Sequence, residues 1–186
     1  MKATLALLTL AALASLHVCA AWQVGRHLDP ITDDVYYTVL TPGERLNEDS
    51  WLADNHPVLV FRIIPHFVNR KTNTLKAEIL AFVSFDPDGI SRHGSTTLVR
   101  FDSNHAEMLH VEPSTDRRAA FFSPEDSRRV YTAARKSSVM HMRIETTLGH
   151  IRTFRFDLAG LPDALATARQ RIFSHAHSVT NSVPND

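Results

Sequence analysis

Apolar and polar side chains alternate along much of the chain, and this period of two predicts a protein built mainly of β-strands. The clearest segment is 75–85, in which every second side chain is apolar and lies on one face. Residues 139–147 alternate in the same way, and 151–158 follow after a Leu-Gly-His turn. The last two segments therefore predict a β-hairpin.

The other strand signals are less regular. Residues 58–64 form an almost continuous apolar run, which is typical of a strand buried on both faces. Pro65 is expected either to end this strand or to place it at a sheet edge. Residues 41–56 are polar and predict a long loop, and 86–89 (Asp-Pro-Asp-Gly) predict a tight turn. Shorter candidate strands are 35–40, 96–101, 107–111 and 119–122.

Two segments carry helix signals. Ser123 precedes Pro124 and two acidic residues, an order that suits a cap, a first helical position and the positive end of the helix dipole. A second helix is expected after Gly160, where apolar residues recur at helical spacing. These residues are Leu161, Leu165, Ala168 and Ile172. About eight strands and two short helices, one mid-chain and one C-terminal, predict a mainly β, antiparallel β-sandwich-like domain.

The first 21 residues differ in pattern from the rest of the chain. Lys2 is followed by an apolar run and by small residues ahead of Trp22, which predicts a secretory signal peptide over 1–21. The run is too short to span a bilayer comfortably, so no stable membrane insertion is expected. A lipoprotein acylated at Cys19 is the alternative, although the residues before Cys19 suit it poorly.

The expected mature protein is therefore periplasmic or secreted. We expect one β-rich domain over 22–173 and a disordered polar tail over 174–186. Cys19 is the only cysteine, so cleavage would leave a protein without disulfides or a thiol nucleophile. The chain has 20 basic and 20 acidic residues, a balance that does not favour nucleic acid as a partner.

Motifs for catalysis or metal binding do not stand out. The 11 histidines are scattered, and no His-Glu-x-x-His sequence occurs. Gly-x-Ser-x-Gly and glycine-rich phosphate loops are absent as well. We therefore expect no catalytic residue, metal site or cofactor, and the sequence does not indicate a small-molecule ligand. The basic pairs at 117–118, 128–129 and 135–136 are interpreted as solvated positions on a helix and its flanking turns.

Several short motifs follow one another in an order that is informative. They are Trp22-x-Val24, Val99-Arg100-Phe101-Asp102, Ser114-Thr115-Asp116, Ala119-Ala120-Phe121 and the terminal Phe154-Arg155-Phe156-Asp157-Leu158-Ala159-Gly160-Leu161. In this order the chain resembles the VasI/TagO-like family of type VI secretion system-associated proteins. Members often carry two cysteines where this chain has Ile63 and, approximately, Ile172. The resemblance implies that these isoleucines replace a crosslink by packing.

The resemblance implies an exported, non-enzymatic accessory or adaptor protein of the cell envelope, associated with a type VI secretion machine. Its expected partner is an envelope or secretion-machine protein. A periplasmic enzyme that acts on envelope substrates and a periplasmic, immunity-type toxin binder are the alternatives. A binding surface is expected near Arg100, Asp102, Ser114 and Asp116, where polar residues gather between two strands.

Overall fold

The structure is a computed structural model that describes residues 22–46, 57–69, 72, 74–85, 95–145 and 149–180. Nine strands and two helices lie within these ranges. They are β1 (Gln23–Leu28), β2 (Val35–Arg45), β3 (Val58–Asn69), β4 (Thr74–Ser84), β5 (Ser95–Phe101), β6 (Glu107–Pro113), β7 (Ala119–Phe122), α1 (Pro124–Ala134), β8 (Val139–Glu145), β9 (Ile151–Asp157) and α2 (Leu161–Thr180). The predicted mainly β class with two helices is confirmed, although α2 has 20 residues and is not short. The predicted leader and the 86–89 turn lie outside the described residues.

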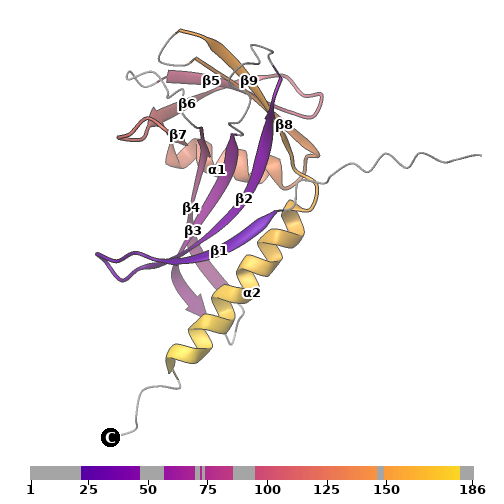
Figure 1. Ribbon diagram of the computed structural model, residues 1–186. Helices are drawn as coiled ribbons and strands as arrows, with labels where there is room; N and C mark the ends of the chain where they lie inside the picture. Colours follow the sequence, from indigo (N-terminus) through magenta and orange to yellow (C-terminus); the bar gives the residue numbers. More distant parts are fainter. Residues whose placement is uncertain are drawn as a thin grey trace, which may run out of the picture.

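The strands form a closed antiparallel barrel, so the prediction of a sandwich is wrong (Figure 1). The order around the barrel is β2-β3-β4-β7-β6-β5-β8-β9, and β9 pairs with β2 again. A sandwich would leave these two strands as sheet edges, whereas their pairing removes both edges. β1 is an additional strand that pairs with the first half of β2.

Closure depends on the unusual length of β2, which changes partner along its course. Residues Val35 to Leu40 pair with β1, and Gly43 to Arg45 pair with β9. The predicted loop over 41–56 is therefore wrong in its first part, and residues 47–56 lie outside the described residues. The turn-like Pro42-Gly43 sequence has another role here, because the absence of a Cβ at Gly43 leaves room for the ring of Phe156.

The interior of the barrel is a continuous apolar core. Its buried residues alternate along each strand with residues on the outer face, as a period of two requires. The largest fully buried side chains in the strands are Tyr37, Phe61, Phe156, Leu59, Met140 and Met142. The alternation predicted for 75–85 is confirmed, because its apolar residues either belong to this core or pack against it.

Helix α1 closes a gap between two strands. Its predicted start is confirmed, since Ser123 caps the helix and its hydroxyl accepts a hydrogen bond from the Asp126 N–H at 3.1 Å. β4 pairs with β7 only from Phe82 to Ser84. Beyond this point the Ala81 N–H donates to the Ser127 hydroxyl at 3.0 Å. Ser127 thus supplies the acceptor that a longer β7 would have provided.

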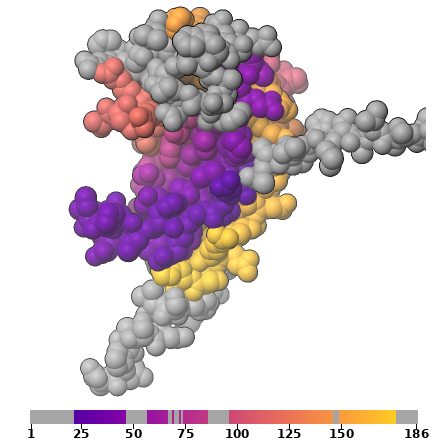
Figure 2. All heavy atoms as spheres, viewed as in Figure 1, coloured from indigo at the N-terminus to yellow at the C-terminus, as the bar shows by residue number. Residues whose placement is uncertain are grey.

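Helix α2 packs against β1, β2 and β3 where these strands extend past the barrel (Figures 1 and 2). Its four predicted apolar residues are buried, and Ile172 belongs to the same core as Ile63. The disordered tail predicted over 174–186 is helical as far as Thr180, and residues 181–186 lie outside the described residues. Neither helix in the described part of the chain is long and apolar enough to cross a membrane.

Two further expectations concern strand ends. β3 continues through Pro65 to Asn69, with a register shift between Pro65 and Phe67. At Pro65 it pairs only with β4, because its pairing with β2 ends at Ile63. Pro65 therefore does not end the strand. The alternative prediction, that it lies at a sheet edge, is confirmed. The predicted hairpin between β8 and β9 is confirmed.

The close approach at Gly43 predicts the effect of one added methyl group. A Cβ at this position would lie 2.4 Å from the ring of Phe156 and 3.0 Å from the Arg155 carbonyl oxygen. We expect Gly43→Ala to lower the free energy of unfolding by about 1–3 kcal/mol, since the buried ring has to move. Urea unfolding followed by circular dichroism measures this change.

Gly25→Ala is the matched control in the same sheet. A Cβ at Gly25 would meet side-chain atoms of His27 and Thr38, both at 2.8 Å. The exposed His27 can turn away, and although Thr38 is buried, only its hydroxyl has to shift, whereas at Gly43 a core ring and a backbone oxygen are in the way. Its loss of stability should therefore be smaller than that of Gly43→Ala. Equal losses for the two variants would contradict the closure argument.

Candidate binding groove

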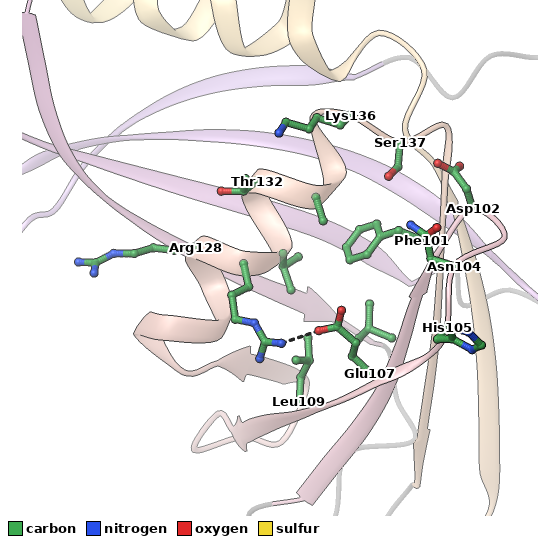
Figure 3. A pocket seen from close by; sticks show the side chains of 14 residues that line it. Phe101, Asp102, Asn104, His105, Glu107, Leu109, Arg128, Thr132, Lys136 and Ser137 are labelled. Carbon is green, nitrogen blue, oxygen red and sulfur yellow. Dashed lines mark hydrogen bonds and ion pairs between the residues drawn. The ribbon is translucent and has the colours of Figure 1, made fainter.

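A groove of about 610 Å³ lies between α1 and the strands β5 and β6 (Figure 3). Its floor is apolar, because the inward faces of the two strands meet the inner side of the helix. The floor residues are Val99, Phe101, Leu109, Val130 and Ala133. A groove of this size with an apolar floor and polar rim has the general character of a ligand-binding site.

The rim of the groove carries charges of both signs. Helix α1 supplies Arg129, and Lys136 follows just after the helix, while the strand side supplies Asp102 and Glu107. Arg128 also lines the groove, but Figure 3 shows its side chain extending away from Glu107. The groove therefore has basic residues on its helix side, Glu107 opposite them on β6, and Asp102 at the end where the chain leaves α1 for β8.

One ion pair crosses the groove. Arg129 donates to Glu107 at 2.5 Å and to Asp126 at 3.0 Å. The side chains of Arg129 and Glu107 are 52% and 61% exposed, so their attraction is weakened by water. Exposed pairs of this kind contribute about 0–1 kcal/mol to stability. A ligand can therefore displace this bridge at little cost in free energy.

Next to the groove, β6 has a free edge. β7 pairs with β6 only over Val111 to Pro113. Within the described ranges, no strand pairs with the earlier part of β6 on this side. The side is already used at His110, whose N–H donates to Asp126 at 3.2 Å and whose carbonyl accepts from the Ser123 N–H at 3.4 Å.

Met108, two residues before His110, has its backbone groups on this same side of β6. Residues two apart direct their backbone groups to the same side, so the N–H and carbonyl of Met108 point the same way as those of His110. Met108 is 67% exposed and lies between Glu107 and Leu109, which both line the groove. The groove is thus bordered by a backbone donor and acceptor.

Of the four predicted binding residues, only Asp102 lines this groove. Its carboxylate accepts hydrogen bonds from the backbone N–H groups of Ser138, at 2.9 Å, and Val139, at 3.0 Å. These two bonds hold the pKa of Asp102 below its usual range. Asp102 has a φ of 49°, in the left-handed region that aspartate tolerates. It therefore ties the end of β5 to the start of β8.

Ser114 and Asp116 lie at the other end of β6, in the turn before β7. The Ser114 hydroxyl donates to Asp116 at 2.6 Å and accepts from the Ala119 N–H at 3.0 Å. Asp116 also accepts from the Arg118 N–H at 3.1 Å. The pKa of Asp116 is lowered, first by the Ser114 hydroxyl and then by the Arg118 N–H. Both residues are thus engaged in forming the turn.

Arg100 points to the outer face of β5, opposite in direction to Val99 and Phe101. The structure therefore does not bring the four predicted residues together in one patch. The groove itself was not predicted from the sequence, although the alternation indicated its apolar strand residues. Arg129 was interpreted as a solvated helix position, because nothing in the local sequence indicates that β6 lies opposite.

No group of three or more His, Cys, Asp or Glu side chains in the described ranges is arranged to hold a metal ion.

The hydrogen bonds to Asp102 predict a pH-dependent stability. The pKa of Asp102 is lower in the folded protein than the unfolded value of about 3.9, so the folded state binds fewer protons. Its carboxylate stabilises the fold above pH 4, and this contribution is lost as the pH falls through the lowered pKa. Asp102→Asn keeps a carbonyl acceptor but no charge. Its melting temperature should be below wild type at pH 7, with a gap that narrows below pH 4.

Thermal unfolding of both proteins from pH 7 to pH 3 measures this gap. Asp33→Asn is the control, because Asp33 also has a positive φ, of 58°. Its carboxylate makes no hydrogen bond to the described residues, so the substitution should leave the melting temperature nearly unchanged. A gap for Asp102→Asn that stays constant with pH would show that the charge contributes nothing.

Comparisons with known proteins identify no relative of this chain. No protein-family model, curated protein or solved structure matches the chain. The VasI/TagO-like resemblance therefore stays a prediction from the sequence, and the groove is the feature on which a function can be argued.

Proposed function

We propose that this protein is an exported accessory protein of the cell envelope that binds an extended segment of a partner protein. The observation that carries this proposal is the groove between α1 and β5–β6 with the free edge of β6 beside it. The leader-like first 21 residues support export, and the resemblance to the VasI/TagO-like family supports an association with a type VI secretion machine.

An extended peptide satisfies the chemistry of this site better than a compact ligand does. Its backbone can pair with the N–H and carbonyl of Met108, which adds a short strand to the barrel. Alternate side chains of such a peptide point to the same side, so an apolar one can enter the floor around Phe101 and Leu109. The sheet edge supplies affinity, and the floor supplies selectivity for that side chain.

The charges on the two sides of the groove set the direction of the bound segment. Lys136 lies at the C-terminal end of the helix side of the groove, and Glu107 lies on the strand side. A partner segment with an acidic and a basic residue on either side of its apolar anchor complements both sides. Such complementarity affects the rate of association and the choice of partner more than the affinity.

A proline at position 108 tests the role of the β6 edge. Met108→Pro removes the N–H that points away from β5, so the pairing of β6 with β5 is retained. Met108→Ala is the matched control, because it removes the side chain and keeps the N–H. Both variants should show the circular dichroism spectrum of the wild type and unfold within a few degrees of it.

The functional measurement is type VI-dependent protein release in a host that carries such a machine. Deleting the gene should lower release, and wild type or Met108→Ala should restore it, whereas Met108→Pro should not. If Met108→Pro is folded and restores release in full, the partner segment does not pair with the free edge of β6. If deleting the gene leaves release unchanged, the proposed association with the secretion machine is wrong.

Export makes a separate prediction about the mature protein. Intact mass measurement of the protein from the periplasmic fraction should give a chain that begins at Trp22. A chain that begins at an acylated Cys19 would instead identify a lipoprotein. Recovery of the whole chain from Met1 in the cytoplasmic fraction would overturn the proposed export.

A further inference from the structure

A second, smaller pocket of about 230 Å³ lies on the outer face of β5, β8 and β9. The strand register places its residues in neighbouring rows. Arg100 on β5 lies opposite His141 on β8, which lies opposite Arg155 on β9. In the next row Arg143 on β8 lies between Leu98 and Thr153. Paired side chains of adjacent strands stand about 5 Å apart at their Cβ atoms.

This register concentrates positive charge around one histidine. Arg100 and Arg155 flank His141 across the sheet, and Arg143 stands two residues along the same strand and face. Burial lowers the pKa of His141, and the positive charges of Arg100 and Arg155 lower it further. The Nδ1 atom of His141 is enclosed and has no hydrogen-bond partner among the described residues.

Acidic residues offset this charge only in part. Glu44 on β2 binds Arg155 at 3.1 Å, and Glu145 on β8 lies one row beyond Arg143. Arg100 and Arg143 form no ion pair with any residue that the structure describes. Two guanidinium groups therefore line the same pocket, and no described residue forms an ion pair with either of them.

We propose that this pocket binds a phosphate group between Arg100, Arg143 and His141. Guanidinium groups donate paired hydrogen bonds that match the oxygen atoms of a phosphate. The anion would also reduce the repulsion among the three arginines, because Arg100, Arg143 and Arg155 lie around the same histidine. This site goes beyond the proposed function, because it lies on the outer face of the barrel and shares no lining residue with the groove.

The phosphate could belong to a soluble molecule or to a lipid headgroup, and the chemistry of the pocket is the same for both. Inorganic phosphate is the probe for the site itself. Binding should shift the NMR signals of the His141 ring and raise its pKa, since a nearby anion favours the imidazolium form. Among the described residues, the register places the charged groups Arg100, Arg143 and Arg155 next to this ring, with Glu44 one strand further away, beyond Arg155.

Arg100→Gln and Arg143→Gln test one at a time the two arginines for which the described residues provide no ion pair. Each should weaken phosphate binding by about tenfold or more, because hydrogen bonds between charged groups are among the strongest in proteins. Arg118→Gln is the control, since Arg118 is an exposed residue in the turn before β7. It changes the net charge equally and should leave the affinity for phosphate unchanged.

Vesicles of phosphatidic acid, with vesicles of phosphatidylcholine for comparison, distinguish the two sources of phosphate. Sedimentation with phosphatidic acid that is lost in Arg100→Gln and kept in Arg118→Gln would assign a lipid headgroup. Phosphate binding without vesicle binding would assign a soluble ligand. The proposal is overturned if phosphate leaves the His141 signals unchanged, or if all three variants bind phosphate as wild type does.

Discussion

The contact between β2 and β9 is the constraint on which the rest of this structure depends. Three residue pairs, from Gly43 to Arg45 on β2, join the two ends of the strand order. The contact requires the backbone of Gly43 to lie against the ring of Phe156 in the core. Without it, the strands would form an open sheet with two exposed edges, and the interior would be accessible to water.

Barrel closure also explains why two possible sites share one strand. β5 lies between β6 and β8 in the closed order. Its inward residues Val99 and Phe101 form part of the floor of the groove beside α1. Its outward residue Arg100 lines the smaller pocket on the outer face of β5, β8 and β9. The two sites are back to back on a single sheet, separated by the thickness of β5. A change in the pairing of β5 would therefore affect both.

Local features of the fold could be predicted from the sequence. The cap at Ser123, the apolar stripe of α2 and the alternation over 75–85 depend on neighbouring residues, and the structure contains all three. Closure could not be predicted in this way. The ion pair between Glu44 and Arg155 joins residues 111 positions apart, and Pro42-Gly43 has the local signature of a turn.

The candidate site also has features that depend on neighbouring residues and features that depend on residues far apart in the sequence. Ser114 and Asp116 attracted attention because they are polar and close in sequence, and this proximity is what makes them a hydrogen-bonded turn. The groove depends instead on α1 lying opposite β5 and β6. Ser127 has a particular consequence for that arrangement, since its bonds to Ala81 and Phe122 anchor the first turns of α1 to two strands. The other end of α1 leads directly into Ser138, whose N–H donates to Asp102 and whose carbonyl accepts from the Leu158 N–H, so both ends of the helix are held and the width of the groove is fixed by the barrel.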